Sequence, residues 1–111
     1  MTASDVQSLV LAEIDDDWER TNTHGVDLRS CLVEPRCMQV IWRTVRDGQV
    51  TQETREVWLV LEQRPVTKDG YKIVFDESRK TFGLASPGFP SDPHPCLAGY
   101  YGDFWTTFGG M

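Results

Sequence analysis

The sequence predicts an α+β fold in which an antiparallel meander sheet of about five strands carries the N-terminal and C-terminal helices packed on one face. Three observations lead to this class. Apolar residues recur at helical spacing near both ends of the chain, whereas the middle alternates with the two-residue period of half-buried strands. Turn dipeptides separate the alternating stretches. With 111 residues, we expect a single α+β domain that spans residues 1–111.

The first helix is expected from about Asp5 to Arg20. Ser4 is its predicted N-cap, because Gln7 three residues later completes a capping box. Apolar side chains recur every four residues along this segment and predict the buried face of the helix. They are Val6, Val10, Ile14 and Trp18.

Alternating apolar residues predict the strands in the middle of the chain. The stretches that alternate are residues 26–33, 37–45, 56–62, 71–76 and 80–85. Pro35 predicts a tight turn between the first two strands, because proline fixes φ near the value that turns need. Four prolines in the segment after the last strand predict an irregular surface crossing that leads to the final helix.

A hairpin turn at Asp47 and Gly48 and the apolar faces of the flanking strands, residues 37–45 and 56–62, predict two different registers. A two-residue turn would place Trp42 opposite Glu53, whereas matching the apolar faces would place it near Val57. Because register generally follows the buried face, we expect a longer loop, a bulge, or a hairpin tip that projects past the sheet.

The segment from Cys96 to Phe108 predicts the C-terminal helix, since its apolar residues fall at helical spacing on one face. They are Leu97, Tyr100, Tyr101, Phe104, Trp105 and Phe108. The opposite face holds two glycines, each of which costs about 0.8–1.0 kcal/mol relative to alanine. We therefore expect this helix to form only when it is docked on the sheet or on another chain.

Composition limits the classes of partner and the compartment. The net charge of −6 disfavours nucleic acid and anionic membrane surfaces, whose phosphates attract basic proteins. The N-terminus lacks the basic region and the long apolar run of a signal peptide, so we expect none. Three cysteines are an odd number for a disulfide framework. The sequence therefore predicts a cytoplasmic protein.

An acidic cluster lies late in the first predicted helix. Glu13, Asp16 and Asp17 have the spacing of one helical face, and carboxylates so arranged can hold a divalent cation. A solvated polar face explains the same pattern with nothing added, and we favour it over a metal site. A patch that steers a protein partner is the other interpretation.

Candidates for catalysis are few. His94 lies two residues from Cys96, and a cysteine with a nearby histidine can form a nucleophile pair. Residues this close in sequence and flanked by prolines seldom reach that geometry. No Cys-x-x-Cys zinc motif or glycine-rich phosphate loop is present, so we expect buried structural thiols, no metal, no cofactor and no catalytic residues.

Aromatic residues concentrate in the last quarter of the chain and have three interpretations. The simplest is a core helix that closes the sheet. The second is an interface, because tyrosine and tryptophan bury area while one polar end stays wet. The third is a ligand pocket between helix and sheet. Its possible walls are Trp18, Trp42, Trp58 and Trp105.

Three stretches resemble the C-terminal half of a group of small acidic bacterial proteins. They are Gly70–Asp76, Phe82–Ala85 and Gly99–Phe108. Proteins of this kind are encoded on integron gene cassettes or act as the immunity partners of toxins. The resemblance implies a stand-alone protein whose role is binding, and no functional residue is carried over from it.

The sequence thus predicts a non-enzymatic cytosolic binding protein that acts through protein–protein contacts, either with a protein partner or as a homodimer, and binds neither nucleic acid nor membrane. Acidic residues would steer association and aromatic residues would anchor it. The residues predicted to bind are Glu13, Asp16, Asp17, Trp18, Tyr101 and Trp105. The alternative is a small-molecule-binding or hydrolytic α+β protein with a cavity between sheet and helices.

Overall fold

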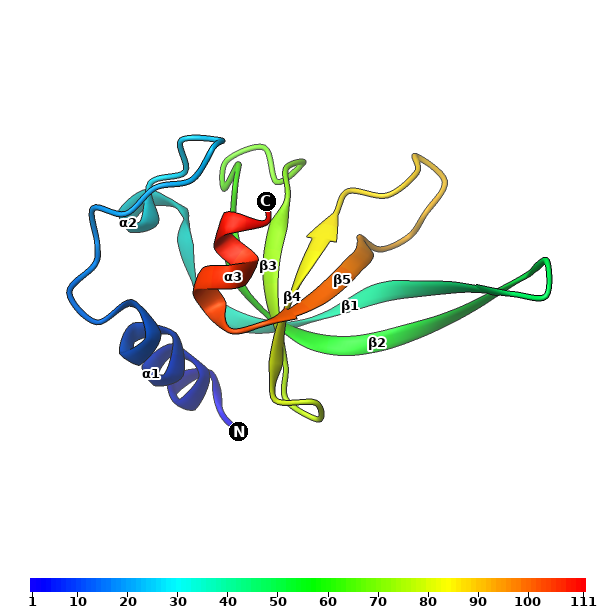
Figure 1. The fold of residues 1–111 in the computed structure, drawn as a ribbon, viewed down its shortest axis with the longest axis horizontal. Coiled ribbons are helices and arrows are strands. Elements are labelled where there is room, and N and C mark those ends of the chain that lie inside the picture. The colour runs from blue at the N-terminus through cyan, green and yellow to red at the C-terminus, as the bar shows by residue number, and fades with distance from the viewer.

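Five strands close into a barrel in the computed structural model, which describes residues 1–111 (Figure 1). Consecutive strands pair antiparallel. Because the number of strands is odd, the first and the last run in the same direction and pair parallel. The strands are β1 (Leu32–Arg46), β2 (Gln49–Glu62), β3 (Lys72–Asp76), β4 (Thr81–Ser86) and β5 (Cys96–Gly102).

Closure of the barrel corrects the predicted open meander. Ile41 of β1 pairs with Cys96 of β5, and the backbone N–H of Ile41 donates to the carbonyl of Pro95 at 2.9 Å. The α+β class, the number of strands and the presence of a helix near each end of the chain are as predicted, although the five strands are not all the predicted segments. The closing contact joins segments that are distant in sequence, so no local pattern could predict it.

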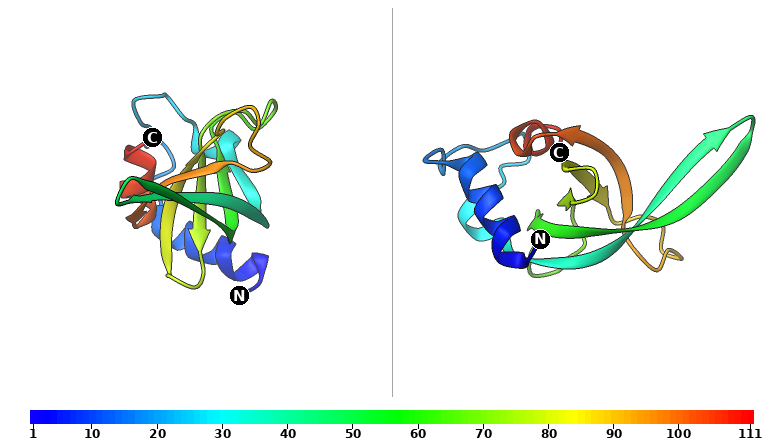
Figure 2. Two further views of the ribbon diagram at one scale, coloured as in Figure 1. Left: turned by 90° about the vertical axis from the view of Figure 1, so that its right-hand side faces the viewer. Right: turned by 90° about the horizontal axis from the view of Figure 1, so that it is seen from below.

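The hairpin between β1 and β2 adopts the register that its turn dictates. Asp47 and Gly48 have φ values of 51° and 75°, as a type I′ turn requires at both central positions. Trp42 consequently lies opposite Glu53 rather than near Val57. The expectation that the register follows the apolar faces is therefore wrong, whereas the expected projecting tip is present, since the hairpin extends well past the barrel (Figures 1 and 2).

Helix α1 (Ala3–Ile14) begins earlier and ends sooner than predicted. Its N-cap is Thr2, whose hydroxyl accepts from the N–H of Asp5 while the Asp5 carboxylate accepts from the N–H of Thr2. The helix ends at Ile14 because Asp15 takes a φ of 55°, which helical backbone does not allow. The predicted buried face is confirmed up to Ile14.

A short helix replaces the strand predicted for residues 26–33. Helix α2 (Leu28–Cys31) is capped by Asp27, whose carboxylate accepts from the N–H of Ser30. Strand β1 then runs through Pro35, where a tight turn was expected. The register shift around that position is a bulge, which accommodates a proline that cannot donate to the ladder.

The predicted C-terminal helix is wrong in its first half. Cys96–Gly102 forms β5, and only the second half is helical, as α3 (Phe104–Gly109). Asp103 caps α3, because its carboxylate accepts from the N–H of Thr106 at 2.8 Å. Two register shifts between β4 and β5 disturb the alternation of buried residues, which hid this strand from pattern analysis.

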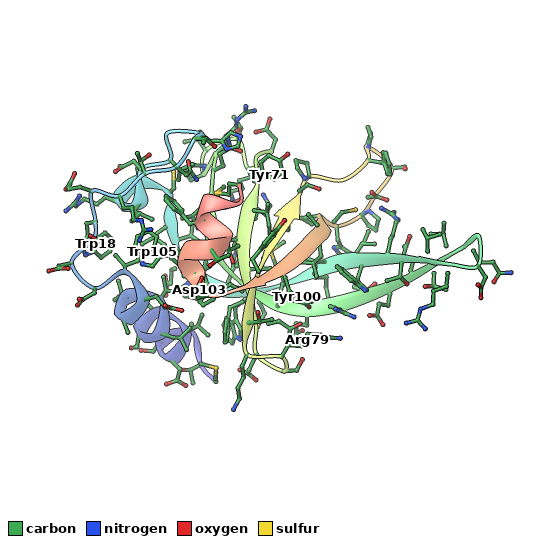
Figure 3. All side chains as sticks on the ribbon, in the orientation of Figure 1. Trp18, Tyr71, Arg79, Tyr100, Asp103 and Trp105 are labelled. Atoms are coloured by element: carbon green, nitrogen blue, oxygen red, sulfur yellow. The ribbon has the colours of Figure 1, made fainter.

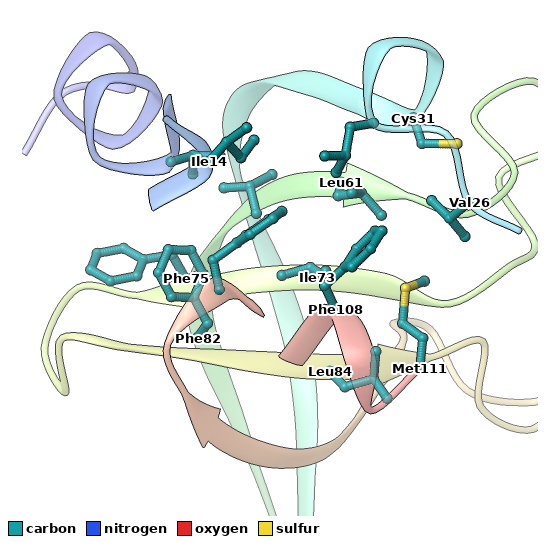
Figure 4. Packing of buried hydrophobic residues seen from close by; sticks show 14 of the residues in the cluster. Ile14, Val26, Cys31, Leu61, Ile73, Phe75, Phe82, Leu84, Phe108 and Met111 are labelled. Carbon is teal, nitrogen blue, oxygen red and sulfur yellow. The ribbon is translucent and has the colours of Figure 1, made fainter. Parts of the chain in front are cut away.

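The main core lies between the barrel and the helices (Figure 4). Within it, Ile14 of α1 and Phe108 of α3 pack with strand residues such as Phe75 and Phe82. A smaller, separate cluster of six buried residues takes its members from all five strands. Its members are Val40, Val57, Leu59, Val74, Ala85 and Leu97.

The terminal helices lie together at the end of the molecule opposite the hairpin tip (Figures 1 and 2). The indole N–H of Trp105 in α3 donates to the backbone carbonyl of Glu13 in α1 at 2.9 Å. This contact joins the first and last helices, as expected for helices on one face. None of the helices combines the length and the apolar character that crossing a membrane would require.

Candidate functional site

Side chains from separate segments gather beside the base of the hairpin, and we call them the arginine–aromatic cluster. Trp42 comes from β1, Arg55 from β2 and Tyr100 from β5, while Asp76 ends β3 and Arg79 lies in the turn that follows. Their contacts are aromatic, cationic and hydrogen-bonded. The barrel brings these residues together although they are distant in sequence, because four of the strands carry one member each.

The register of the β1–β2 hairpin places the side chain of Arg55 beside that of Trp42. Arg55 lies opposite Val40, and Val40 and Trp42 share a face because side chains two apart on a strand point the same way. Diagonal neighbours in an antiparallel pair are close enough for long side chains to touch. The two-residue turn therefore determines the contact between the guanidinium and the indole.

Arg55 lies between two aromatic rings. Its guanidinium carbon is 4.9 Å from the centre of the Trp42 ring and 5.7 Å from that of Tyr100. Nη1 donates to the Tyr100 hydroxyl at 3.1 Å, and Nε donates to a carboxylate oxygen of Glu53 at 2.7 Å. Only 17% of the side chain is exposed. These contacts restrict the guanidinium from several directions.

The Tyr100 hydroxyl links Arg55 to a buried carboxylate. It donates to Asp76 at 2.5 Å, and the Asp76 side chain is 4% exposed. The other carboxylate oxygen of Asp76 accepts from the hydroxyl of Ser78 at 2.7 Å and from the backbone N–H of Arg79 at 3.2 Å. The Arg79 guanidinium carbon lies 5.5 Å from the centre of the Tyr100 ring.

Burial and hydrogen bonds act in opposite directions on the titrating groups of the cluster. Burial alone would raise the pKa of Asp76, but hydrogen bonds from Tyr100 and Ser78 outweigh it, so the carboxyl pKa is lowered. Burial and the bond to Asp76 raise the pKa of the Tyr100 phenol. Tyr100 therefore keeps its proton at neutral pH and acts as a hydrogen-bond donor to a fixed carboxylate.

This arrangement suits binding better than proton transfer. A general base needs a pKa near the working pH, whereas Asp76 and Tyr100 are displaced in opposite directions from neutrality. No buried side-chain nitrogen or oxygen lacks a hydrogen-bond partner. What the cluster offers to another molecule is a restrained cation flanked by partly exposed rings.

The acidic residues predicted to steer a partner do not share one helical face. Glu13 lies in the last turn of α1, but Asp16 and Asp17 follow the end of the helix at Ile14. Asp17 pairs with Arg20 at 3.8 Å. The helical-face prediction is wrong because Asp15 turns the chain away, and no group of three or more His, Cys, Asp or Glu residues is placed to hold a metal.

The predicted aromatic anchors lie away from the arginine–aromatic cluster. Trp105 and Trp18 lie at the helical end of the molecule, and the ring of Tyr101 comes close to Gly110 at the end of α3, whereas Tyr100 lies beside the hairpin (Figure 3). Both tryptophans pack against the main core, and Arg20 covers Trp105 at 4.4 Å from its ring centre. Tyr101 is 41% exposed on β5. The sequence pattern thus selected two residues that serve largely in packing.

Sequence reasoning missed Arg55 as a site residue. The signal that could have found it was the two-residue turn, because that register places Arg55 diagonally beside Trp42. Preference for matched apolar faces led away from this register. From the sequence, Trp42 is expected only as a cavity wall and Tyr100 as part of a helix, so neither indicates the cluster.

Cys96 contacts Arg43 and Asp92 and forms no observed pair with His94. Arg43 donates to the Cys96 sulfur at 2.9 Å and to both carboxylate oxygens of Asp92. The hydrogen bonds from Arg43 and from the N–H of Phe89 lower the pKa of Asp92 to about 2. Burial and Asp92 raise the pKa of the Cys96 thiol, which opposes its use as a nucleophile.

The three cysteines differ in exposure. All are free, with Cys31 buried, Cys96 partly buried and Cys37 exposed. The prediction of buried structural thiols is therefore right for Cys31 and wrong for Cys37, whose position in β1 faces away from the cores.

A cavity of about 600 Å³ lies between α1, the β3–β4 end of the barrel and the start of α3. Its apolar wall includes Phe75 and Phe82, and its polar wall includes Glu13, Lys80 and Asp103. None of the four tryptophans expected as walls lines it. The cavity thus lies between helix and sheet as the alternative function requires, but with other residues.

Comparisons with known proteins leave the site to be interpreted from its own geometry. No family model matches the chain, and neither a curated protein nor a solved structure is similar to it.

Proposed function

We propose that this protein is a non-enzymatic cytoplasmic binding protein and that the arginine–aromatic cluster is its protein-binding surface. The partner is either a different chain, in the manner of an immunity protein, or a second copy. The observation that carries the proposal is Arg55, which is held between Trp42 and Tyr100 at the edge of the barrel. Free cysteines agree with a reducing compartment.

Two features of the cluster and one of the whole chain support this role. Tryptophan, tyrosine and arginine are the residues that most often dominate binding energy at protein interfaces. Contacts with Glu53 and Tyr100 restrict Arg55 before a partner arrives, so less side-chain entropy is lost on binding. If the partner is a different chain of basic character, the net charge of −6 would also hasten its encounter with this protein.

Affinity capture with paired variants tests the proposal. The wild-type protein and the Trp42→Ala and Arg55→Ala variants serve as baits in lysate of the producing cells, and each captured chain is then purified and titrated. We expect a chain whose Kd rises at least about 30-fold with either variant, as for an interface residue worth 2 kcal/mol. Thermal unfolding verifies that both variants are folded.

Arg29→Ala provides the matched control for this experiment. Arg29 also lies over a tryptophan, 5.6 Å from the Trp18 ring centre, and pairs with Glu19 at 2.6 Å, but at the helical end of the molecule. We expect this variant to bind as wild type does. Partners that bind all four proteins equally well would refute the role of the cluster.

The cavity beside α1 supports a second candidate, which is binding of a small apolar molecule that carries a polar group. Phe75 and Phe82 would contact the apolar part, and Glu13, Asp103 and Lys80 would contact the polar part. Screening a fragment library by NMR is the test. Binding should shift the signals of Leu9, Phe75 and Phe82, and a library that leaves all three unmoved argues against this function.

A further inference from the structure

The outer half of β2 is a free strand edge. Residues Gln49–Val57 pair with β1 on one side only, because pairing with β3 begins at Trp58. Most of this edge is exposed, and it contains no proline that would prevent another strand from pairing with it. A two-stranded ribbon is marginal in water by itself, so a further strand along this edge would stabilise it.

Backbone geometry identifies which residues can bond outward. Ile41 lies opposite Thr54, and the N–H of Ile41 points away from β2 toward Pro95. Ile41 and Thr54 therefore form a non-hydrogen-bonded pair, which leaves the N–H and C=O of Thr54 directed outward. By alternation, the backbone groups of Gln52 and Glu56 point outward as well.

We propose that this edge pairs antiparallel with the same edge of a second copy, with Thr54 on the two-fold axis. The inference rests on the proposed function, and it takes the bound protein to be another copy of this chain. In an antiparallel pair, a residue whose backbone groups point outward must face another such residue, and these residues alternate along β2. The two-fold axis therefore passes through one residue, which lies opposite the same residue of the second copy. The possible centres along the middle of the edge are Gln52, Glu53 and Thr54.

Charge selects among these registers. Centring on Glu53 sets two carboxylates directly opposite each other, which is unfavourable. Centring on Gln52 leaves Glu53 opposite Thr51 and gains no charge pair. Centring on Thr54 places Glu53 of each copy opposite Arg55 of the other, so the Glu53–Arg55 pair that exists within each copy gains two opposite-charge neighbours across the interface. The edge is thus self-complementary in one register.

The same register also determines where the exposed hairpin tip of each copy would lie on the other copy. Val45 and Val50 are 69% and 65% exposed, an unusual position for a pair of facing valines. With Thr54 on the axis, the two free edges can pair from Thr51 to Val57, and Val50 of each copy comes to the end of the other's free edge, where Phe75 of β3 already pairs with Trp58. Trp58 lines a hollow of about 490 Å³ with Cys37 and Glu56, at the point where the free edge ends. The exposed valine of each tip would therefore lie near this hollow of the other copy.

Sedimentation equilibrium at protein concentrations up to about 1 mM is the first test. We expect the wild type to dimerise and Thr54→Pro to raise the dimer Kd at least about tenfold, because each copy loses one outward N–H donor. Thr54→Ala keeps that N–H and should dimerise as wild type does. Because the N–H of Thr54 bonds nothing within one copy, proline there spares the β1–β2 ladder.

Disulfide trapping tests the register without relying on the proline variant. In a Cys37→Ser background, Thr54→Cys should cross-link to its own copy, because facing Cα atoms about 5.5 Å apart suit a disulfide. Gln52→Cys should remain reduced, since its copy would lie about 13 Å further along the strand. Cross-linking of Gln52→Cys instead of Thr54→Cys would overturn the proposal.

The outcomes separate this inference from the proposed function. A wild type that stays monomeric at every concentration overturns self-pairing of β2. The proposed function fails on a different result, namely that no captured chain depends on Trp42 or Arg55. A dimer that Thr54→Pro leaves intact likewise overturns the pairing at this edge.

Discussion

Replacing Lys72 with methionine is expected to lower the free energy of unfolding by about 3–5 kcal/mol. Lys72 and Glu62 face each other across β2 and β3, with 8% and 4% of their side chains exposed. Nζ of Lys72 donates to Glu62 at 2.9 Å and to the carbonyl of Lys68 at 2.8 Å. Removing the lysine leaves a buried carboxylate without a partner, and urea unfolding measures the loss.

The double variant Glu62→Leu with Lys72→Met is the control. It removes both charges and fills the space with apolar groups, so it should recover most of the stability that the single variant loses. If the single and double variants were equally unstable, the cause would be loss of the other contacts of the Lys72 side chain and not an unpaired carboxylate. That result would contradict the account of the pair.

The second large effect is expected for Tyr100→Phe, which should cost about 1.5–3 kcal/mol at pH 7. Asp76 then loses its donor at one oxygen, and its pKa rises toward the ordinary value. Since the lowered pKa stabilises the fold only while the carboxyl is ionised, the deficit should shrink as the pH falls below about 3.9.

Tyr101→Phe is the matched control for that prediction. Tyr101 is the next residue on β5 and is 41% exposed. Its loss of a hydroxyl should change the stability by less than about 0.5 kcal/mol. Urea unfolding of both variants between acidic and neutral pH measures the contrast, and a deficit for Tyr100→Phe that does not vary with pH would contradict the role given to Asp76.

Local patterns predicted the elements whose signals are local. The buried face of α1, the Asp47–Gly48 turn and the alternating residues of β3 appear as the sequence indicated. The aromatic pair Phe104 and Phe108 also lies on a helix, with its rings stacked 6.0 Å apart in the core. In each case the spacing within a few residues was sufficient.

Elements that depend on distant contacts were missed. Cys96–Gly102 has apolar residues at helical spacing, yet it forms a strand because β4 and the Ile41 region of β1 offer it hydrogen bonds. The glycines in this segment have low helix propensity and already disfavoured a helix. Gly83 shows how close the strands come, since a Cβ there would lie 2.9 Å from the carbonyl oxygen of Gly99.

The candidate site followed from the same distant contacts. Only closure of the barrel brings Tyr100 of β5 to Arg55 of β2, so no local sequence motif could predict this contact. The predicted site used the density of acidic and aromatic residues instead. Those residues lie mainly at the helical end, where Trp105 and Trp18 pack on the core.

Preorganisation of Arg55 is the property on which the proposed function depends most, and NMR relaxation of arginine Nε–Hε groups measures it directly. We expect an order parameter near 0.85 for Arg55, as in rigid backbone, because aromatic rings and two acceptors hold its guanidinium. Arg29, which is 56% exposed, should fall below about 0.6. An Arg55 as mobile as Arg29 would contradict a binding surface formed in advance.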